Sequence, residues 1–236
     1  MKLYGYRRKD GTVGVRNHLL VIPTVSCANK AALKVADMVP GAVAIPHPYG
    51  CSYDDAEQDL LHATLIGLGR NPNVGACLVV TLGCETTSAD KVVEGIARSG
   101  KPVELLHVQN EGGALKAALK GAEWARREVT RLSKERRVEV SLSDLMVAVE
   151  CGGSDACSGI SANPAVGWAA DAIVAAGGTV VLSETEEIVG AEDLLAARAT
   201  DENVKADLLR IVALSEESVR RGSSNASGIY ITPGNV

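Results

Sequence analysis

Thiol, imidazole and carboxylate side chains recur in this sequence where short apolar runs end. Those of metal-ligand type are Cys27, His47, Cys51 and Cys84. Iron and zinc accept thiolate and imidazole ligands, so His47, Cys51 and Cys84 form a candidate ligand set, with Cys27 as its fourth member. No compact motif such as Cys-x-x-Cys occurs. The set therefore depends on the fold to bring the four residues together.

Two acidic residues lie beside cysteines of this kind: Glu85 follows Cys84, and Glu150 precedes Cys151. A carboxylate at such a place can act as a general base or as a hard metal ligand. It can equally cap the helix that follows. The next stretch offers backbone N–H groups to an anion such as a substrate carboxylate, although glycine pairs also serve in ordinary turns. This stretch is Gly152, Gly153, Ser154 and Asp155.

The remaining histidines and one cysteine favour structural roles. His18 lies at the start of an apolar run, His62 lies within an amphipathic helical pattern, and His107 lies inside a run. Cys77 is flanked by apolar residues, and free cysteine is among the most buried residue types. We expect all four residues to support the fold.

Short apolar runs alternate with helical patterns along the chain. The runs are too short for helices, and most are rich in β-branched residues, so they predict strands. They cover residues 19–24, 42–45, 76–82, 103–108, 145–149 and 179–182. This order predicts an α/β fold with a doubly wound, mainly parallel sheet. Ligands bind beyond the carboxyl ends of such strands, so the thiols, His47 and the acids are expected to converge there.

Helix signals occupy the segments between the runs. Asp54 and Glu57 have capping-box spacing, and Asn163-Pro164 is typical of an N-cap followed by the first helical residue. Further helices are predicted over residues 88–98, 113–132 and 202–221. The polar stretch 133–143 is either a domain boundary or a solvated helix end. The chain closes on a strand-like 229–231 and a turn signal, a pattern typical of a piece of a longer polypeptide.

Composition limits the partners and the compartment. The chain has 236 residues, 46% hydrophobic residues and a net charge of -5. Such a chain has no basic face for nucleic acid. No apolar run is long enough for a membrane span, and the charged residues 1–10 lead us to expect no signal peptide. We therefore expect a cytoplasmic protein whose six cysteines are reduced.

Several blocks of the sequence resemble the altronate/galactarate dehydratase family, which also includes (2R)-sulfolactate sulfo-lyase. Three of them are HPYGC (47–51), LGCET (82–86) and ECGGSD (150–155). The others are residues 5–18, 158–164, 177–185 and 233–235. The resemblance covers the whole chain in the family's order.

The resemblance implies an iron-dependent lyase that eliminates water, or sulfite, from a hydroxy acid. Residues 1–137 would be the dimerising second domain, and residues 142–236 would begin a Rossmann-like C-terminal domain. From the resemblance we expect a chain without the family's small β-clip module, as in members that carry it on a separate subunit, and without much of the family's C-terminal domain. The implied assembly is a homodimer acting on a small sugar acid, with such a subunit as a further partner.

Elimination from a sugar acid needs a base, a group that holds the enediolate, and an acid for the leaving hydroxyl. The metal would be Fe2+, with Mn2+ or another divalent ion as alternatives, held by the candidate ligand set. Glu85 or Glu150 would be the base. Asn29 and the stretch 152–155 would hold the substrate.

Two other classes of function are also compatible with the residues. Cys27, Cys51, Cys84 and Cys151 could bind an iron–sulfur cluster in an electron-transfer or activating protein. Alternatively, the chain could be a non-catalytic interaction subunit in which the cysteines only pack. Metal and sulfide analysis separates the three classes.

Overall fold

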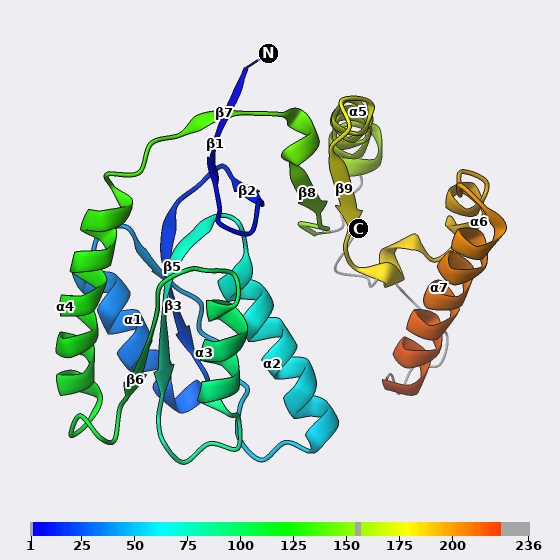
Figure 1. The fold of residues 1–236 in the computed structure, drawn as a ribbon. Helices are drawn as coiled ribbons and strands as arrows, with labels where there is room; N and C mark the ends of the chain where they lie inside the picture. Colours follow the sequence, from blue (N-terminus) through cyan, green and yellow to red (C-terminus); the bar gives the residue numbers. More distant parts are fainter. Residues whose placement is uncertain (1, 154–156, 223–236) are drawn as a thin grey trace. The chain divides into compact units, whose positions relative to one another are not determined.

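The structure is a computed structural model that describes residues 2–153 and 157–222. It divides into two compact units, Met1–Ser141 and Leu142–Val236 (Figure 1). Ser154, Asp155 and the strand expected over residues 229–231 lie outside the described residues.

Four parallel strands form the central sheet of the first unit, in the order β4-β3-β5-β6. Their bounds are His18–Pro23 for β3, Ala42–Ala44 for β4, Val74–Thr81 for β5 and Val103–His107 for β6. Every residue of β5 is buried, as expected for a strand covered on both faces. The chain runs from β3 outward to β4 and then returns to β5 on the other side, so the strand order reverses between β3 and β5. The parallel α/β fold is confirmed.

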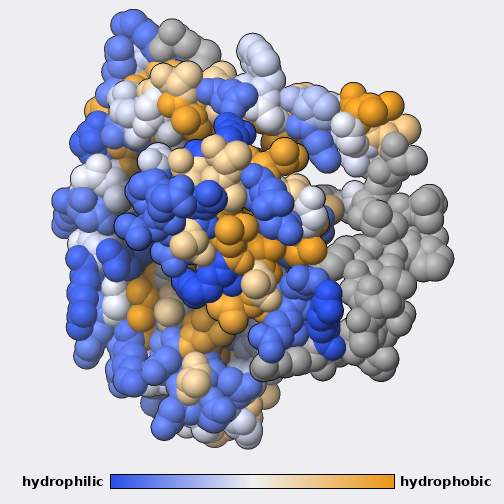
Figure 2. Space-filling view, turned by 90° about the vertical axis from the view of Figure 1, so that its right-hand side faces the viewer, coloured by the Kyte–Doolittle hydropathy of each residue, from blue (hydrophilic) through white to orange (hydrophobic). Residues whose placement is uncertain are grey.

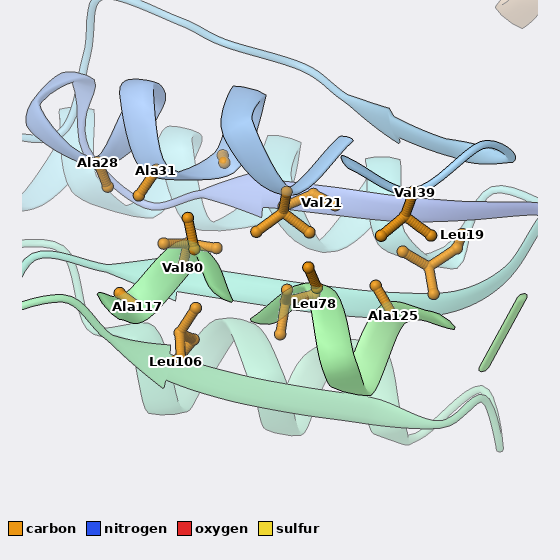
Figure 3. Packing of buried hydrophobic residues seen from close by; sticks show 14 of the residues in the cluster. Leu19, Val21, Ala28, Ala31, Val39, Leu78, Val80, Leu106, Ala117 and Ala125 are labelled. Atoms are coloured by element: carbon orange, nitrogen blue, oxygen red, sulfur yellow. The ribbon is translucent and has the colours of Figure 1, made fainter. Parts of the chain in front are cut away.

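Helices cover both faces of this sheet (Figure 1). Helices α1 (Asn29–Met38) and α4 (Ala114–Leu132) pack on one face. Helices α2 (Asp55–Arg70) and α3 (Ala89–Ala97) pack on the other. Val21 of β3, Leu78 of β5 and Ala125 of α4 belong to one hydrophobic cluster on this face of the sheet (Figure 3). Small helix residues compensate for the absence of phenylalanine, because they let the helix backbones approach the strands closely.

Two predicted helix starts are confirmed. Asp54 accepts a hydrogen bond of 2.9 Å from the Glu57 amide, and Glu57 accepts one from the Asp54 amide, so the capping box is complete. The Ser88 side chain accepts a bond from the Lys91 amide and caps α3. Each cap satisfies backbone N–H groups that the first helical turn leaves unpaired.

A second, small sheet of the first unit was not expected from the sequence. Strand β1 (Leu3–Arg7) pairs antiparallel with β2 (Val13–Gly14) and with β7 (Val138–Val140). Strand β7 lies in the stretch 133–143, for which the sequence left a domain boundary and a solvated helix end as alternatives. Arg8 follows β1, and its buried guanidinium donates to the Pro72 carbonyl and to Asn17, which ties this region to the main sheet.

The second unit contains a two-stranded parallel sheet of β8 (Met146–Val149) and β9 (Thr179–Leu182). Helix α5 (Ala162–Ala175) connects them, and α6 (Glu192–Ala196) and α7 (Glu202–Gly222) follow. The predicted N-cap Asn163 is wrong: α5 begins at Ala162 after Ser161, so Asn163 already lies in its first turn.

Apolar side chains of the second unit remain widely exposed. Helix α5 has no buried residue, and its Trp168 is 77% exposed. Other exposed apolar side chains of the described part of this unit are Met146, Ile160, Val166, Val174, Val181, Leu182, Leu194, Val204, Ile211 and Leu214. Figure 2 shows apolar residues, coloured orange, at the surface near the middle of the drawn face. Among the described residues, no helix has the length and apolar character that crossing a bilayer requires.

Candidate active site at the carboxyl edge of the sheet

The loops that follow β3, β4 and β5 meet at one edge of the main sheet. The Thr24 hydroxyl donates a hydrogen bond of 2.6 Å to Oε1 of Glu85. The Ser26 amide donates to the Tyr49 carbonyl at 2.8 Å. These bonds join the segment after β3 to each of the other two loops. The convergence predicted from strand order is therefore confirmed for the loops that carry Cys27, His47, Cys51, Cys84 and Glu85.

Gly50 lets the HPYGC loop approach β3 closely. Its φ is +104°, which favours glycine. A Cβ atom at this position would lie 2.3 Å from the Thr24 carbonyl oxygen and 2.8 Å from the Val25 Cα. The Gly50 carbonyl also accepts a bond of 3.2 Å from the Thr87 hydroxyl. A glycine is thus required where three loops come into contact.

Glu85 is the best-held acidic side chain of this edge. Its Oε1 accepts hydrogen bonds from the hydroxyls of Thr24 and Thr81 and from the Leu82 amide, and its Oε2 accepts one of 2.7 Å from the Gly83 amide. Burial raises the pKa of this carboxyl, but the hydrogen bonds outweigh burial and lower the pKa from 4.5 to about 2. A carboxylate this weakly basic with both oxygens engaged orders a loop and is poorly suited to removing a proton. The structure does not favour the base role predicted for Glu85.

Both ring nitrogens of His47 are engaged, one by the last residue of β3 and one by the loop that carries His47. Its Nε2 lies 2.7 Å from the Pro23 carbonyl oxygen, and its Nδ1 accepts a bond of 3.2 Å from the Tyr49 amide. This arrangement fits the neutral tautomer that carries its proton on Nε2. A metal ion could take Nδ1 only if the Tyr49 bond broke.

Asn29 holds the backbone of His47. Its Nδ2 donates to the His47 carbonyl at 2.8 Å, and its Oδ1 accepts from the His47 amide at 3.4 Å. Both polar atoms of the side chain are therefore occupied by the loop. The role of Asn29 in substrate binding stays a prediction, and its positioning role is the one that the contacts show.

The thiols of Cys27, Cys51 and Cys84 are exposed and free. Within residues 2–153 and 157–222, however, no three His, Cys, Asp or Glu side chains are arranged to hold a metal ion. The loops converge, but the donor atoms do not form a ready coordination site. Metal binding by Cys27, His47, Cys51 and Cys84 stays a prediction, which requires these side chains to rearrange. Cys77 is buried in the core as expected, and burial raises the pKa of its thiol to about 12.

The other predicted site residues belong to the second unit. Glu150, Gly152 and Gly153 are exposed after β8. The Cys151 amide donates a bond of 2.7 Å to the Glu184 carboxylate, so this turn is fixed to the segment after β9. The predicted roles of Glu150 and of residues 152–155 stay predictions.

Sequence reasoning missed three contributors to the edge. Thr24 directly follows β3 and Thr81 is the last residue of β5, and both hydroxyls donate to Glu85. The signal was a threonine at the end of each buried run. Tyr49 stacks on His47, with ring centroids 6.0 Å apart, and forms the wall of a cavity of about 350 Å³. The residues around this cavity are Tyr49, Tyr53, Glu57, Leu60, Leu61 and Thr64.

The first unit is a doubly wound parallel α/β domain whose polar loops gather where the strand order reverses, the place where open sheets of this class commonly bind ligands. Two family models match the chain. Residues 5–133 match the second domain of D-galactarate dehydratase/altronate hydrolase, and residues 142–236 match the C-terminal domain of D-galactarate/altronate dehydratase. The chain belongs to the D-galactarate/altronate dehydratase family.

Curated relatives carry three different names. The chain is 43% identical to (2R)-sulfolactate sulfo-lyase subunit beta of Chromohalobacter salexigens, over 85% of this chain and 51% of that protein. It is 35% identical to altronate dehydratase of Bacillus subtilis, over 85% of this chain and 42% of that protein. It is 32% identical to galactarate dehydratase (L-threo-forming) of Escherichia coli, over 98% of this chain and 48% of that protein. The chain thus spans about half the length of these relatives.

Proposed function

We propose that this chain forms part of a lyase that eliminates water from a sugar acid of the altronate or galactarate type. Family membership and the names of two relatives support this reaction class. The structural observation that carries the proposal is the bond from Thr24 to Glu85. It joins the β3 and β5 loops where the strand order reverses, the place where open parallel sheets bind ligands.

The reaction removes a proton and a hydroxyl from neighbouring carbons. A base takes the proton from the carbon next to the carboxylate, and the electron pair forms a double bond as the C–O bond to the β-hydroxyl breaks. The hydroxyl takes a proton from an acid and leaves as water, and the enol becomes a 2-keto-3-deoxy acid. We assign the base to Glu150, because Glu85 has too low a pKa and too many hydrogen bonds.

The residues of the first unit then have a positioning role. Glu85 orders the loop that presents Cys84, and Asn29 orders the loop that presents His47 and Cys51. Such prior ordering lowers the cost of reaching the reactive geometry. Because the thiols and His47 do not form a ready coordination site, no reaction step is assigned to Fe2+ or Mn2+.

A second candidate reaction has an observation in its favour. The sulfo-lyase subunit is 43% identical to this chain, whereas the two dehydratases described above are 35% and 32% identical. The chemistry would be the same elimination with sulfite in place of hydroxide as the leaving group. The two reactions therefore place similar demands on the base and on the carboxylate-binding groups.

One assay separates the two reactions. The complete gene product that contains this sequence would be incubated anaerobically with Fe2+ and with altronate, galactarate or sulfolactate in turn. Formation of a 2-keto-3-deoxy acid supports the dehydratase, and release of sulfite supports the sulfo-lyase. Turnover of none of the three substrates, in the presence of its partner subunit, would contradict both.

We also propose that the chain works in a homodimer with a separate small β-clip subunit. The name of one relative, a subunit beta, supports a multi-subunit enzyme. Light scattering on the chain alone and with the small subunit tests this assembly. A monomer under both conditions would contradict it.

A further inference from the structure

His62 is a buried histidine that the proposed chemistry does not use. It lies on α2, is only 6% exposed, and accepts a hydrogen bond of 3.0 Å at Nε2 from the Ser88 amide. Ser88 ends the loop that carries Cys84 and Glu85, and its side chain caps α3. His62 therefore anchors the 82–88 loop, which carries Cys84 and Glu85, through the Ser88 amide.

The hydrogen bond determines the protonation state of His62. Since Nε2 accepts, a neutral ring must carry its proton on Nδ1. Nδ1 is buried and, among the described residues, has no hydrogen-bond partner. Buried polar groups without partners are rare in native proteins. The ring is therefore kept in place at the expense of one unsatisfied donor.

The surroundings of His62 oppose a charged ring. Burial lowers the pKa of His62, the nearby Lys91 of α3 lowers it further, and Asp59 of α2 raises it. The strands beneath α2 contribute no acid or base that offsets this effect: β5 carries only the buried Cys77 thiol, and His18 of β3 is exposed at the amino end of its strand. Neutral His62 is thus the form that the fold accommodates.

We propose that His62 is a positioning residue whose neutral ring holds the 82–88 loop through Ser88, and whose protonation releases that loop. A proton taken up from solvent occupies the Nε2 lone pair, so two N–H donors then face each other and the bond to Ser88 is lost. Any change in catalytic turnover that follows from release of the loop rests on the proposed lyase function. The loss of loop order itself does not depend on that function.

Release would also reach the neighbouring loop. The residue before Ser88 is Thr87, whose hydroxyl donates to the Gly50 carbonyl. Displacement of Ser88 weakens this bond, and the segment that carries His47 and Cys51 then loses one of its contacts. The bonds around Glu85, and the bond from the Gln109 amide to the Leu82 carbonyl, would then still hold the start of the 82–88 loop.

Amide hydrogen exchange tests the proposal without any substrate. The protection factor of the Ser88 amide would be measured by NMR between about pH 5 and about pH 7.5, a range that spans histidine titration. In the unmodified chain we expect protection to fall about tenfold or more at the acid end, because local opening becomes easier. His62→Gln retains an acceptor oxygen but does not titrate, so its protection should not depend on pH.

Two controls make the result decisive. His107→Gln replaces a partly buried histidine of β6 and should leave the pH dependence of Ser88 protection unchanged. The 15N shifts of the His62 ring in the unmodified chain should show the Nδ1–H tautomer. A Nε2–H tautomer, pH-independent protection in the unmodified chain, or persistent pH dependence in His62→Gln would overturn the proposal. Absence of lyase activity alone would affect only the proposed function.

Discussion

The Thr24 hydroxyl donates a 2.6 Å hydrogen bond to Glu85, although 61 positions separate the two residues in the sequence. Thr24 directly follows β3, and Glu85 lies in the loop after β5. The bond therefore spans the place where the strand order reverses. It links a carboxylate of strongly lowered pKa to the edge at which open α/β sheets commonly bind ligands.

Glu85 makes the stability of the first unit depend on acid pH. Its folded pKa of about 2 lies below its ordinary 4.5, so the stabilisation is complete above about pH 4.5 and is lost as the pH falls toward about 2. Glu85→Gln replaces an acceptor with an NH2 group that faces the Gly83 amide. We expect it to lower the free energy of unfolding at neutral pH by about 2 kcal/mol.

Urea unfolding at pH 7 and at acid pH measures this effect. The variant should lose less stability than the unmodified chain as the pH falls. Thr24→Val, which removes one donor but keeps the carboxylate, is the matched variant and should retain part of the pH dependence. An identical acid response in Glu85→Gln and the unmodified chain would rule out the assigned pKa.

Comparing Gly50 with Gly11 tests whether the HPYGC loop (47–51) contacts β3 as closely as the structure shows. Both have positive φ, +104° and +87°, but a Cβ at Gly11 meets nothing within 4 Å. Gly11→Ala should cost about 1 kcal/mol for the backbone conformation alone. Gly50→Ala should cost about 3 kcal/mol or more, because the Cβ also collides with Thr24 and Val25. Equal urea midpoints for the two variants would contradict the contact.

Metal content tests the candidate ligand set. If Cys51 and Cys84 bind iron, anaerobically purified protein should contain stoichiometric iron, and alanine at either position should abolish it. Cys157→Ala is the control, because this exposed cysteine lies outside the set. Undiminished iron in both Cys51→Ala and Cys84→Ala would refute the ligand assignment, and acid-labile sulfide would instead indicate a cluster.

Trp168 reports on the exposed helix α5. It is 77% exposed, whereas the chain's other tryptophan, Trp124, is partly buried against the core of the first unit. Acrylamide should therefore quench the fluorescence of Trp124→Tyr, which retains Trp168, several-fold more strongly than that of Trp168→Tyr. Equal quenching would show that another polypeptide or a second copy covers α5 in solution.

The sequence predicted the main sheet because its strands are strongly apolar. The sequence of β5 (VGACLVVT) is short, apolar and rich in β-branched residues, which favours a buried strand, and the predicted 179–182 coincides with β9. The small sheet escaped prediction for the opposite reason. β1 (LYGYR) and β7 (VEV) are short and half polar, and they pair across more than 130 residues. Nothing local marks such strands.

The candidate site was predictable as a place but not as a set of contacts. Strand ends in a parallel sheet must meet at one edge, so the gathering of the loops followed from topology. The engagement of Glu85 by four donors and of His47 at both nitrogens depends on loop backbone conformation, which residue types do not determine. For the same reason, no spacing rule links His62 to Ser88.

The pairing of Leu3 with Val140 brings the entry and the exit of the first unit together. A fold with adjoining ends can be spliced into another polypeptide, or reconnected in a new order, with little disturbance of its interior. A domain of this kind can be combined with different neighbouring domains. A circularly permuted version, opened in the exposed turn around Gly11 and closed by a short linker between residues 2 and 141, should still fold cooperatively.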